Sequence, residues 1–311
     1  MRYTRVCRQI NLASHLIVNP LKIENTHLIR ESKTTFPVPK FVSFDLFGTV
    51  YFLKEPVSRL YHEIGKQFGV MRSPESIGSR FRDVYAQLNQ TYPNYGKTSN
   101  HEITNATDWW KQLVVDVFEI DHFRDSSHSN DLCEYLLQHF TTGDAYEVFP
   151  DVIPTLEKLK SQGIRLIGST NSDDRVFELL QNLGIASYFD HIYTSYELGH
   201  CKPDRQFFME IVKQFHPVND KLHLFLENCW HVGNDYNQDF LGAVKAGWNG
   251  VFVDRTRTSE FFTAKDKLQI QNDNECFMSG GTTNDNPDMI VIANNRIVVD
   301  SLNQLQGLFK D

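Results

Sequence analysis

The chain has 311 residues, of which 41% are hydrophobic and 23% charged, and its formal net charge is -8 at pH 7. This balance is typical of a globular protein that buries a core, and it excludes a disordered or collagen-like chain. The acidic charge argues against nucleic acid as a partner, and no apolar run approaches the roughly 18 residues that a membrane-spanning helix needs.

The first 34 residues differ in charge from the rest of the chain. They carry six basic and two acidic residues, and no acid precedes Glu24. Apolar residues recur at helical spacing beside Arg2, Arg5 and Arg8. A basic amphipathic helix is typical of a mitochondrial transit peptide, and import explains it better than stable membrane attachment. We predict that residues 1–34 target the protein to the mitochondrial matrix; the alternative is an untargeted extension of a cytoplasmic protein.

A short buried strand is predicted at residues 40–44, directly before Asp45 and a glycine turn. The next stretch has helical apolar spacing in four runs: 57–70, 73–88, 107–120 and 129–140. Ser73, and Thr107 with Asp108, are expected helix starts because short polar side chains satisfy free backbone amides. We therefore predict an all-helical domain at residues 57–147, inserted after the first strand.

After Pro150 the pattern alternates between helix and strand. Helices are predicted at 151–163, 173–184, 204–215 and 239–248, and strands at 164–170, 191–195, within 223–235 and at 250–254. Residues 265–288 are polar and predict a mobile loop, followed by a strand at 289–299 and a short helix at 301–309. The alternation predicts an α/β protein with a Rossmann-like, doubly wound parallel sheet built from residues 35–56 and 148–311.

Polar side chains follow the ends of several predicted strands, which is the edge where parallel sheets bind ligands. They are Asp45, Gly48, Thr49, Thr170, Asn171, Lys202, Asp235 and Asp239. An aspartate there can attack phosphorus or carbon, while a hydroxyl and an ammonium can hold an anion. Two carboxylates four residues apart can hold a magnesium ion with bound waters. Taken singly, each residue also fits a helix cap or a solvated charge.

In their order and spacing these motifs resemble the haloacid dehalogenase-like hydrolase superfamily, from about Lys40 to Asp254. The segment DLFGT matches its nucleophile motif, Thr170 with Asn171 its second motif, TSYELGHCKPD its lysine motif, and VGNDYNQDFLGAVKAGW its acidic motif. The segment at 92–96 and the pair Trp109–Trp110 are similar to a branch called haloacid dehalogenase-like hydrolase domain-containing protein 3. For these aromatic residues we favour packing over substrate contact, because aromatic side chains dominate core energetics.

The resemblance implies a role for each candidate residue. Asp45 would be the nucleophile, and Thr170 and Lys202 would hold the anionic group. Gly48, Thr49 and Asn171 would bind the substrate phosphate. Magnesium would be held by Asp45, the Phe47 backbone carbonyl, Asp235 and Asp239. The helical block would be a cap that closes over a small, anionic substrate through hinges near Leu53–Val57 and Gly143–Val148.

Two positions depart from the family's pattern. Phe47 occupies the place where most phosphatases of the family have a second Asp, and losing general acid–base help costs roughly 10²–10⁴ in rate. Asn234 stands where many members have Asp. The leading prediction is therefore a slow phosphatase that acts through an aspartyl-enzyme intermediate. One alternative is a non-catalytic metabolite-binding or interaction protein of the same fold.

A second alternative is a dehalogenase that hydrolyses at carbon, because dehalogenases of the family also have an aromatic residue at the position of Phe47. Such an enzyme needs no metal and would need a cap arginine, for which Arg80 and Arg82 are candidates. His200 and Cys201 are not expected to form a nucleophile pair, because adjacent side chains point apart. Cys229 and His231 are expected to be buried packing residues.

Overall fold

The computed structural model describes residues 36–97, 102–120, 126–216, 221–263, 278–279 and 289–309. The predicted targeting segment, 1–34, and most of the predicted loop at 265–288 lie outside these ranges. The described residues belong to two compact units. Unit 1 comprises the described residues of 1–43, 151–165 and 216–311, and unit 2 those of 44–150 and 166–215.

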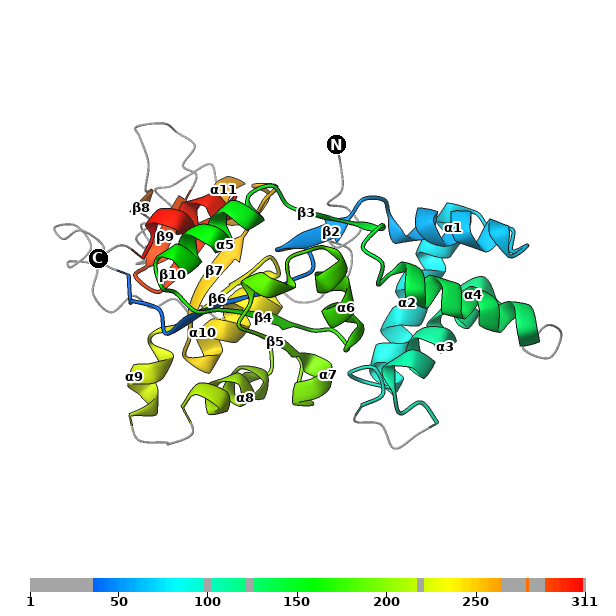
Figure 1. Cartoon of the computed structure of the whole chain (residues 1–311), viewed down its shortest axis with the longest axis horizontal. Helices are drawn as coiled ribbons and strands as arrows, with labels where there is room; N and C mark the ends of the chain where they lie inside the picture. The colour runs from blue at the N-terminus through cyan, green and yellow to red at the C-terminus, as the bar shows by residue number, and fades with distance from the viewer. Residues whose placement is uncertain are drawn as a thin grey trace. The chain divides into compact units, whose positions relative to one another are not determined.

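The main sheet has eight strands in the order β5-β4-β1-β6-β7-β10-β9-β8 (Figure 1). Their bounds are β1 Phe41–Phe44, β4 Leu166–Thr170, β5 His191–Thr194, β6 Cys229–Gly233, β7 Asn249–Val253, β8 Met278–Ser279, β9 Met289–Ala293 and β10 Arg296–Val299. The pairs β4–β5, β6–β7 and β7–β10 are parallel, whereas β9 pairs antiparallel with β10 and β8. Strands β1, β4, β6 and β7 are buried along their whole length, as expected for a parallel sheet covered by helices. The predicted Rossmann-like α/β class is confirmed.

Unit 1 surrounds its strands with short helices and turns: α5 Val152–Ser161, α9 Leu222–Leu226, the π-turn η2 Tyr236–Leu241, α10 Gly242–Ala246, α11 Glu260–Thr263 and the 3₁₀ turn η3 Leu302–Gly307. Part of its core is an apolar cluster of Phe240, Phe252, Ile290, Ile292 and Val298.

Two predictions in unit 1 are wrong in detail. The run at 289–299 is not one strand but the hairpin β9–β10, because Asn294 and Asn295 form a tight turn that asparagine tolerates well. Residues 278–279, predicted as loop, form β8. The strand predicted within 223–235 is present as β6, and helix α9 precedes it.

Unit 2 contains the predicted helical block as α1 Val57–Gln67, α2 Pro74–Thr91, α3 Ala106–Phe118 and α4 Ser126–His139. These helices share an apolar core that includes Ile77, Trp109 and Leu113, each at most 1% exposed. Ser73 caps α2 as predicted, accepting a bond from the Ser76 amide. The predicted start of α3 at Thr107–Asp108 is wrong, because Asn105 caps that helix by accepting from the Asp108 amide at 2.9 Å.

The rest of unit 2 precedes and follows this block in the sequence. The part that follows it comprises α6 Arg175–Asn182, the 3₁₀ turn η1 Ala186–Tyr188, α7 Ser195–Leu198 and α8 Arg205–Phe215, together with β4 and β5. Strands β2 Tyr51–Leu53 and β3 Tyr146–Val148, which the sequence did not predict, form an antiparallel pair within or beside the two expected hinges. The hinges and the domain limits at 57 and 147 remain predictions.

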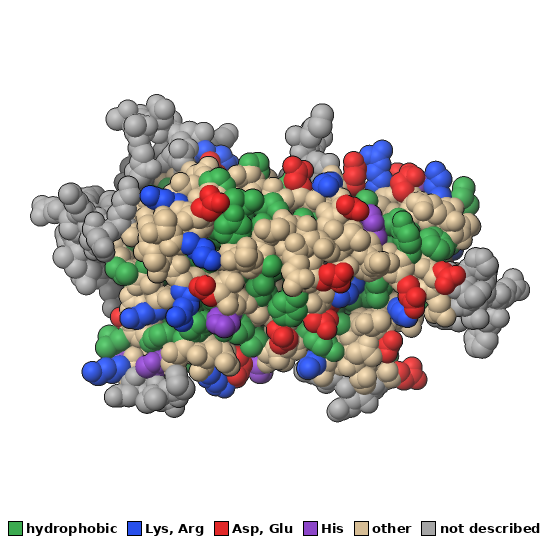
Figure 2. Space-filling view, viewed as in Figure 1, with side chains coloured by type: hydrophobic (Ala, Val, Ile, Leu, Met, Phe, Trp, Pro, Cys, Tyr) green, Lys and Arg blue, Asp and Glu red, His purple; other side chains and the backbone are tan. Residues whose placement is uncertain are grey.

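On the face drawn in Figure 2, acidic and basic side chains are interspersed. Among the residues that the structure describes, no helix is long and apolar enough to cross a membrane.

A buried aspartate joins three segments of unit 1. The Asp151 carboxylate accepts bonds of 2.7 Å from the Arg255 guanidinium, the Ser301 hydroxyl and the Leu302 amide. Burial alone would raise the pKa of Asp151, but these hydrogen bonds and the Arg255 charge lower it below its ordinary value. The chain before α5, the segment after β7 and the start of η3 therefore depend on one ionised carboxylate.

We expect Asp151→Asn to lower the free energy of unfolding at pH 7 by about 1.5–3 kcal/mol, the usual range for hydrogen bonds to a charged group. Because the folded-state pKa is depressed, this stabilisation is present above the unfolded value of about 3.9 and is lost as the pH falls through the folded value. Urea unfolding at several pH values should show the gap to wild type closing below about pH 4. The exposed Asp131→Asn is the control, and a gap independent of pH would contradict this explanation.

Candidate active site

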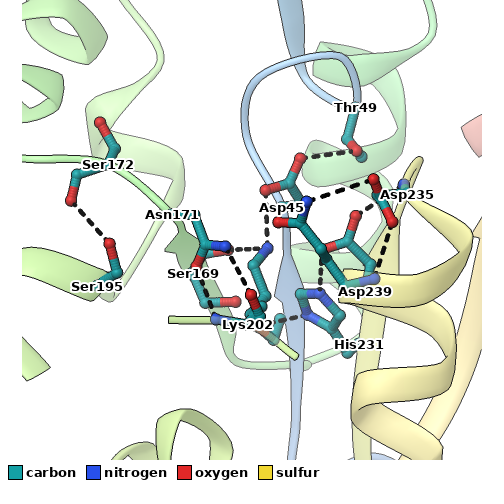
Figure 3. Close-up of polar contacts among 12 residues, drawn as sticks. Asp45, Thr49, Ser169, Asn171, Ser172, Ser195, Lys202, His231, Asp235 and Asp239 are labelled. Atoms are coloured by element: carbon teal, nitrogen blue, oxygen red, sulfur yellow. Dashed lines mark hydrogen bonds and ion pairs between the residues drawn. The ribbon is translucent and has the colours of Figure 1, made fainter. Parts of the chain in front are cut away.

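Asp45 directly follows β1, and its carboxylate is held by two side chains (Figure 3). The Lys202 ammonium donates to Oδ1 at 2.8 Å, and the Thr49 hydroxyl donates to Oδ2 at 3.2 Å. The Asp45 side chain is 11% exposed, whereas that of Lys202 is only 2% exposed. The carboxylate is therefore fixed in orientation, with a cation beside it, and remains accessible from solvent.

Lys202 is itself held by the segment that ends β4. Its ammonium donates to the Ser169 carbonyl at 3.0 Å, and its backbone exchanges two hydrogen bonds with the Asn171 side-chain amide, at 2.8 and 2.9 Å. Thr170, between these residues, is 3% exposed. Asn171 thus positions Lys202, a role that the sequence did not suggest, and its binding of a substrate phosphate remains a prediction.

The turn after Asp45 contains two of the other candidate residues. Gly48 has φ 88°, a left-handed conformation that favours glycine, and its amide donates to the Tyr51 carbonyl at 2.7 Å. Phe47 is 46% exposed, and its ring makes edge-on contacts with Tyr51 and Tyr146, with centroids 5.9 and 6.5 Å apart. The turn after Asp45 therefore presents an exposed apolar ring to solvent.

The acidic motif lies in unit 1, where its carboxylates are bound by neighbouring groups. Asp239, 2% exposed, contacts His231 Nε2 through Oδ1 at 3.1 Å and accepts the Asp235 amide through Oδ2 at 2.9 Å. His231 Nδ1 lies 3.1 Å from the Ser43 hydroxyl. Asp235 Oδ1 caps the following turn by accepting two backbone amides at 2.8 and 2.9 Å.

Gly233 makes room for this arrangement at the end of β6. A Cβ atom at Gly233 would lie 2.3 Å from the Asp239 carboxyl carbon. Only glycine therefore allows the Asp239 side chain its position against the strand. Within the described ranges, no group of three or more His, Cys, Asp or Glu side chains is already arranged to hold a metal ion.

Several residues with structural roles near the candidates were missed by the sequence analysis. Asp173, 2% exposed, accepts two bonds from the Arg175 guanidinium at 2.9 and 2.8 Å, one from the Arg175 amide at 3.0 Å and one from the Trp110 indole at 2.7 Å. The Tyr95 hydroxyl donates to the Asn171 carbonyl at 3.1 Å. The aromatic residues of the helical block thus pack, as expected, and also bind the segment after β4. In the sequence, Asp173 lies shortly after the end of a strand, and that position could have identified it as a candidate.

Other candidate residues make contacts that account for their positions without a role in a reaction. Arg80 binds the end of α3, donating to the Asp116 carbonyl at 3.1 and 2.7 Å and pairing with Glu119 at 2.9 Å. His200 lies 3.5 Å from Asp204, and burial raises the pKa of the Cys201 thiol, so neither suits a nucleophile pair. Cys229 and His231 are fully buried, although His231 also contacts Asp239.

Comparison with known proteins gives consistent results. The family model described as haloacid dehalogenase-like hydrolase matches residues 39–247, more than half of the chain. "Uncharacterized protein YMR130W" of Saccharomyces cerevisiae is 30% identical over 87% of this chain and 93% of its own length. The human haloacid dehalogenase-like hydrolase domain-containing protein 3 is 26% identical over 69% and 81%, respectively. Magnesium-bound YfnB of Bacillus subtilis, a putative HAD-hydrolase, shares the fold with a TM-score of 0.56, at 12% identity and with 88% and 99% coverage.

We expect Gly233→Ala to displace the Asp239 carboxylate and to lower the free energy of unfolding by about 1–3 kcal/mol, as overpacking of a filled site does. Thermal or urea unfolding measures the loss. Gly307→Ala is the matched control, because a Cβ atom there meets nothing within 4 Å. Equal stability of the two variants would show that Asp239 moves aside without cost.

Proposed function

The chain belongs to the haloacid dehalogenase-like hydrolase family, and from that premise we propose that it is a slow phosphatase acting on a small phosphorylated molecule through an aspartyl-enzyme intermediate. The observation that supports this most is the Asp45 carboxylate, oriented by Lys202 and Thr49 yet 11% exposed. A nucleophile needs both a fixed direction of attack and access to its substrate.

In this proposal a carboxylate oxygen of Asp45 attacks the phosphorus atom, and water later hydrolyses the resulting acyl phosphate. Lys202, with Thr170 at the end of β4, stabilises the charge on the transferring phosphoryl group. Lys202 is suited to this because its backbone is fixed by Asn171 and its ammonium is almost wholly buried. A fixed cation needs no reorganisation as charge develops.

We further propose that magnesium is held by Asp45, the Phe47 carbonyl, Asp235 and Asp239. The donor chemistry fits, because all four supply the hard oxygen ligands that magnesium prefers. Among the described residues, Asp235 Oδ2 has one weak contact, 3.5 Å from the Gln238 amide, which leaves lone pairs for a ligand. The ion would neutralise negative charge on the substrate phosphate.

The remaining parts of the proposal concern access and location. Residues 57–147 would act as a cap that excludes water from the site, moving about the hinges near Leu53–Val57 and Gly143–Val148. The basic segment at 1–34 would direct the protein to the mitochondrial matrix. A dehalogenase-type reaction at carbon and a non-catalytic binding protein remain the rivals, and Phe47 is the residue that favours them.

Purified full-length protein should release phosphate from a panel of small phosphate esters with magnesium and should lose that activity in chelator. Asp45→Asn should reduce turnover by at least about 10⁴-fold, as removal of a covalent nucleophile does. The exposed Asp83→Asn on α2 is the matched control and should behave as wild type. Unchanged turnover in Asp45→Asn would refute the proposal, and halide release that persists in chelator would favour the dehalogenase.

A further inference from the structure

Hydrolysis of a phosphate ester depends on the fate of the leaving oxygen, which departs more easily when a nearby acid gives it a proton. Two donors next to Asp45 are already committed. The Lys202 ammonium donates to Asp45 and to the Ser169 carbonyl, and the Thr49 hydroxyl donates to Asp45. The Thr49 hydroxyl and two of the three N–H groups of the Lys202 ammonium are thus directed at the nucleophile and the backbone and not at a leaving group.

Another ionisable side chain of unit 2, Asp173, is not a suitable acid at neutral pH. Burial would raise the pKa of Asp173, but the hydrogen bonds and charge of Arg175 and the bond from Trp110 lower it, so this carboxyl holds no proton. Tyr51, which contacts Phe47, is only 4% exposed and so is poorly placed to meet a substrate.

Phe47 has the accessible position that a proton donor would need. It follows Asp45 by two residues, is 46% exposed, and has no exchangeable proton. Its edge-on contacts with Tyr51 and Tyr146 make an aromatic surface of three rings, of which Phe47 is the most exposed. Such a surface suits an aromatic or apolar leaving group and cannot protonate an alkoxide.

We propose that the substrates of this protein are phosphate compounds whose leaving group departs as a stable anion, such as the phosphates of phenols or enols and acyl phosphates. This inference rests on the proposed function, because it requires Asp45 to be a phosphoryl acceptor. It goes further by excluding ordinary alkyl phosphates as good substrates, since an alkoxide is a strong base that needs a proton to leave.

The two steps balance without an acid. An Asp45 oxygen forms a bond to phosphorus, the bond from phosphorus to the leaving oxygen breaks, and the leaving group takes the electron pair as a phenolate, enolate or carboxylate. Water then adds its oxygen to the phosphorus of the acyl phosphate, and the bond to Asp45 breaks. The carboxylate is regenerated, and both protons of the water leave with dihydrogen phosphate.

The test compares kcat/KM of the full-length protein, with magnesium, for phenyl, para-nitrophenyl and dinitrophenyl phosphate. We use kcat/KM because it reports the step in which the leaving group departs even when the acyl phosphate accumulates. For wild type, kcat/KM should fall steeply as the leaving group becomes more basic. Acetyl phosphate tests acyl phosphates separately from aryl phosphates. Strong turnover of acetyl phosphate alone would show that the substrates are acyl phosphates.

Phe47→Asp and Phe47→Asn form a matched pair, because both remove the ring and only Asp can carry a proton. For an alkyl phosphate, whose alkoxide needs a proton to leave, Phe47→Asp should exceed Phe47→Asn by a factor approaching the roughly 10²–10⁴ that general acid catalysis supplies, and for phenyl phosphate by less. For dinitrophenyl phosphate the two should differ little. Phe47→Asn should keep the steep dependence of wild type.

Two outcomes would overturn the inference, and they are distinguishable. Asp45-dependent turnover that is equally fast across the series would show that some group protonates the leaving oxygen, so the inference fails while the phosphatase stands. No Asp45-dependent turnover even of dinitrophenyl or acetyl phosphate would remove the proposed function and the inference together. If Phe47→Asp does not fold, kcat/KM of the wild-type protein across the series still tests the inference.

Discussion

The buried ammonium of Lys202 is the constraint on which the candidate site depends. An unpaired charge out of water is costly, so a lysine side chain that is 2% exposed requires partners on every side. Asp45 and the Ser169 carbonyl are partners of the ammonium, while the Asn171 amide holds the Lys202 backbone. Satisfying one charge therefore brings together the ends of two strands and the loop after α7, and it orients the carboxylate that we propose as nucleophile.

The same segment after β4 is bound from the other side by the helical block. Tyr95 holds the Asn171 carbonyl, and Trp110 with Arg175 satisfies the buried Asp173 carboxylate. Removing the Arg175 side chain would leave the buried Asp173 carboxylate without its charged partner, which costs more than the bond itself contributes. Packing of the block and the geometry around Lys202 are thus linked through three consecutive residues of one loop, 171–173.

In unit 1, the position of a buried carboxylate depends on the absence of a neighbouring side chain and not on an opposite charge. The absence of a side chain at Gly233 lets Asp239 lie against β6, where His231 and the Asp235 amide bind its two oxygens. His231, on β6, also contacts Ser43 on β1. One buried ring therefore contacts both a neighbouring strand and the acidic motif. The carboxylates proposed as magnesium ligands are consequently oriented by the protein itself, which limits the reorganisation that binding would require.

The sequence by itself determined the elements with a strong local pattern: the four helices at 57–139, most of the alternating core, and the positions of Asp45 and Thr170 at strand ends. Lys202, expected after a strand, instead follows helix α7. Apolar periodicity and cap residues are local, so one chain is enough to recognise them. The pairing of β2 with β3, the role of Asn171 and the Asp173–Arg175–Trp110 contacts were decided only by the tertiary structure. They join residues as far apart as 51 and 148, or 110 and 173, and separations of that length carry no periodic signal.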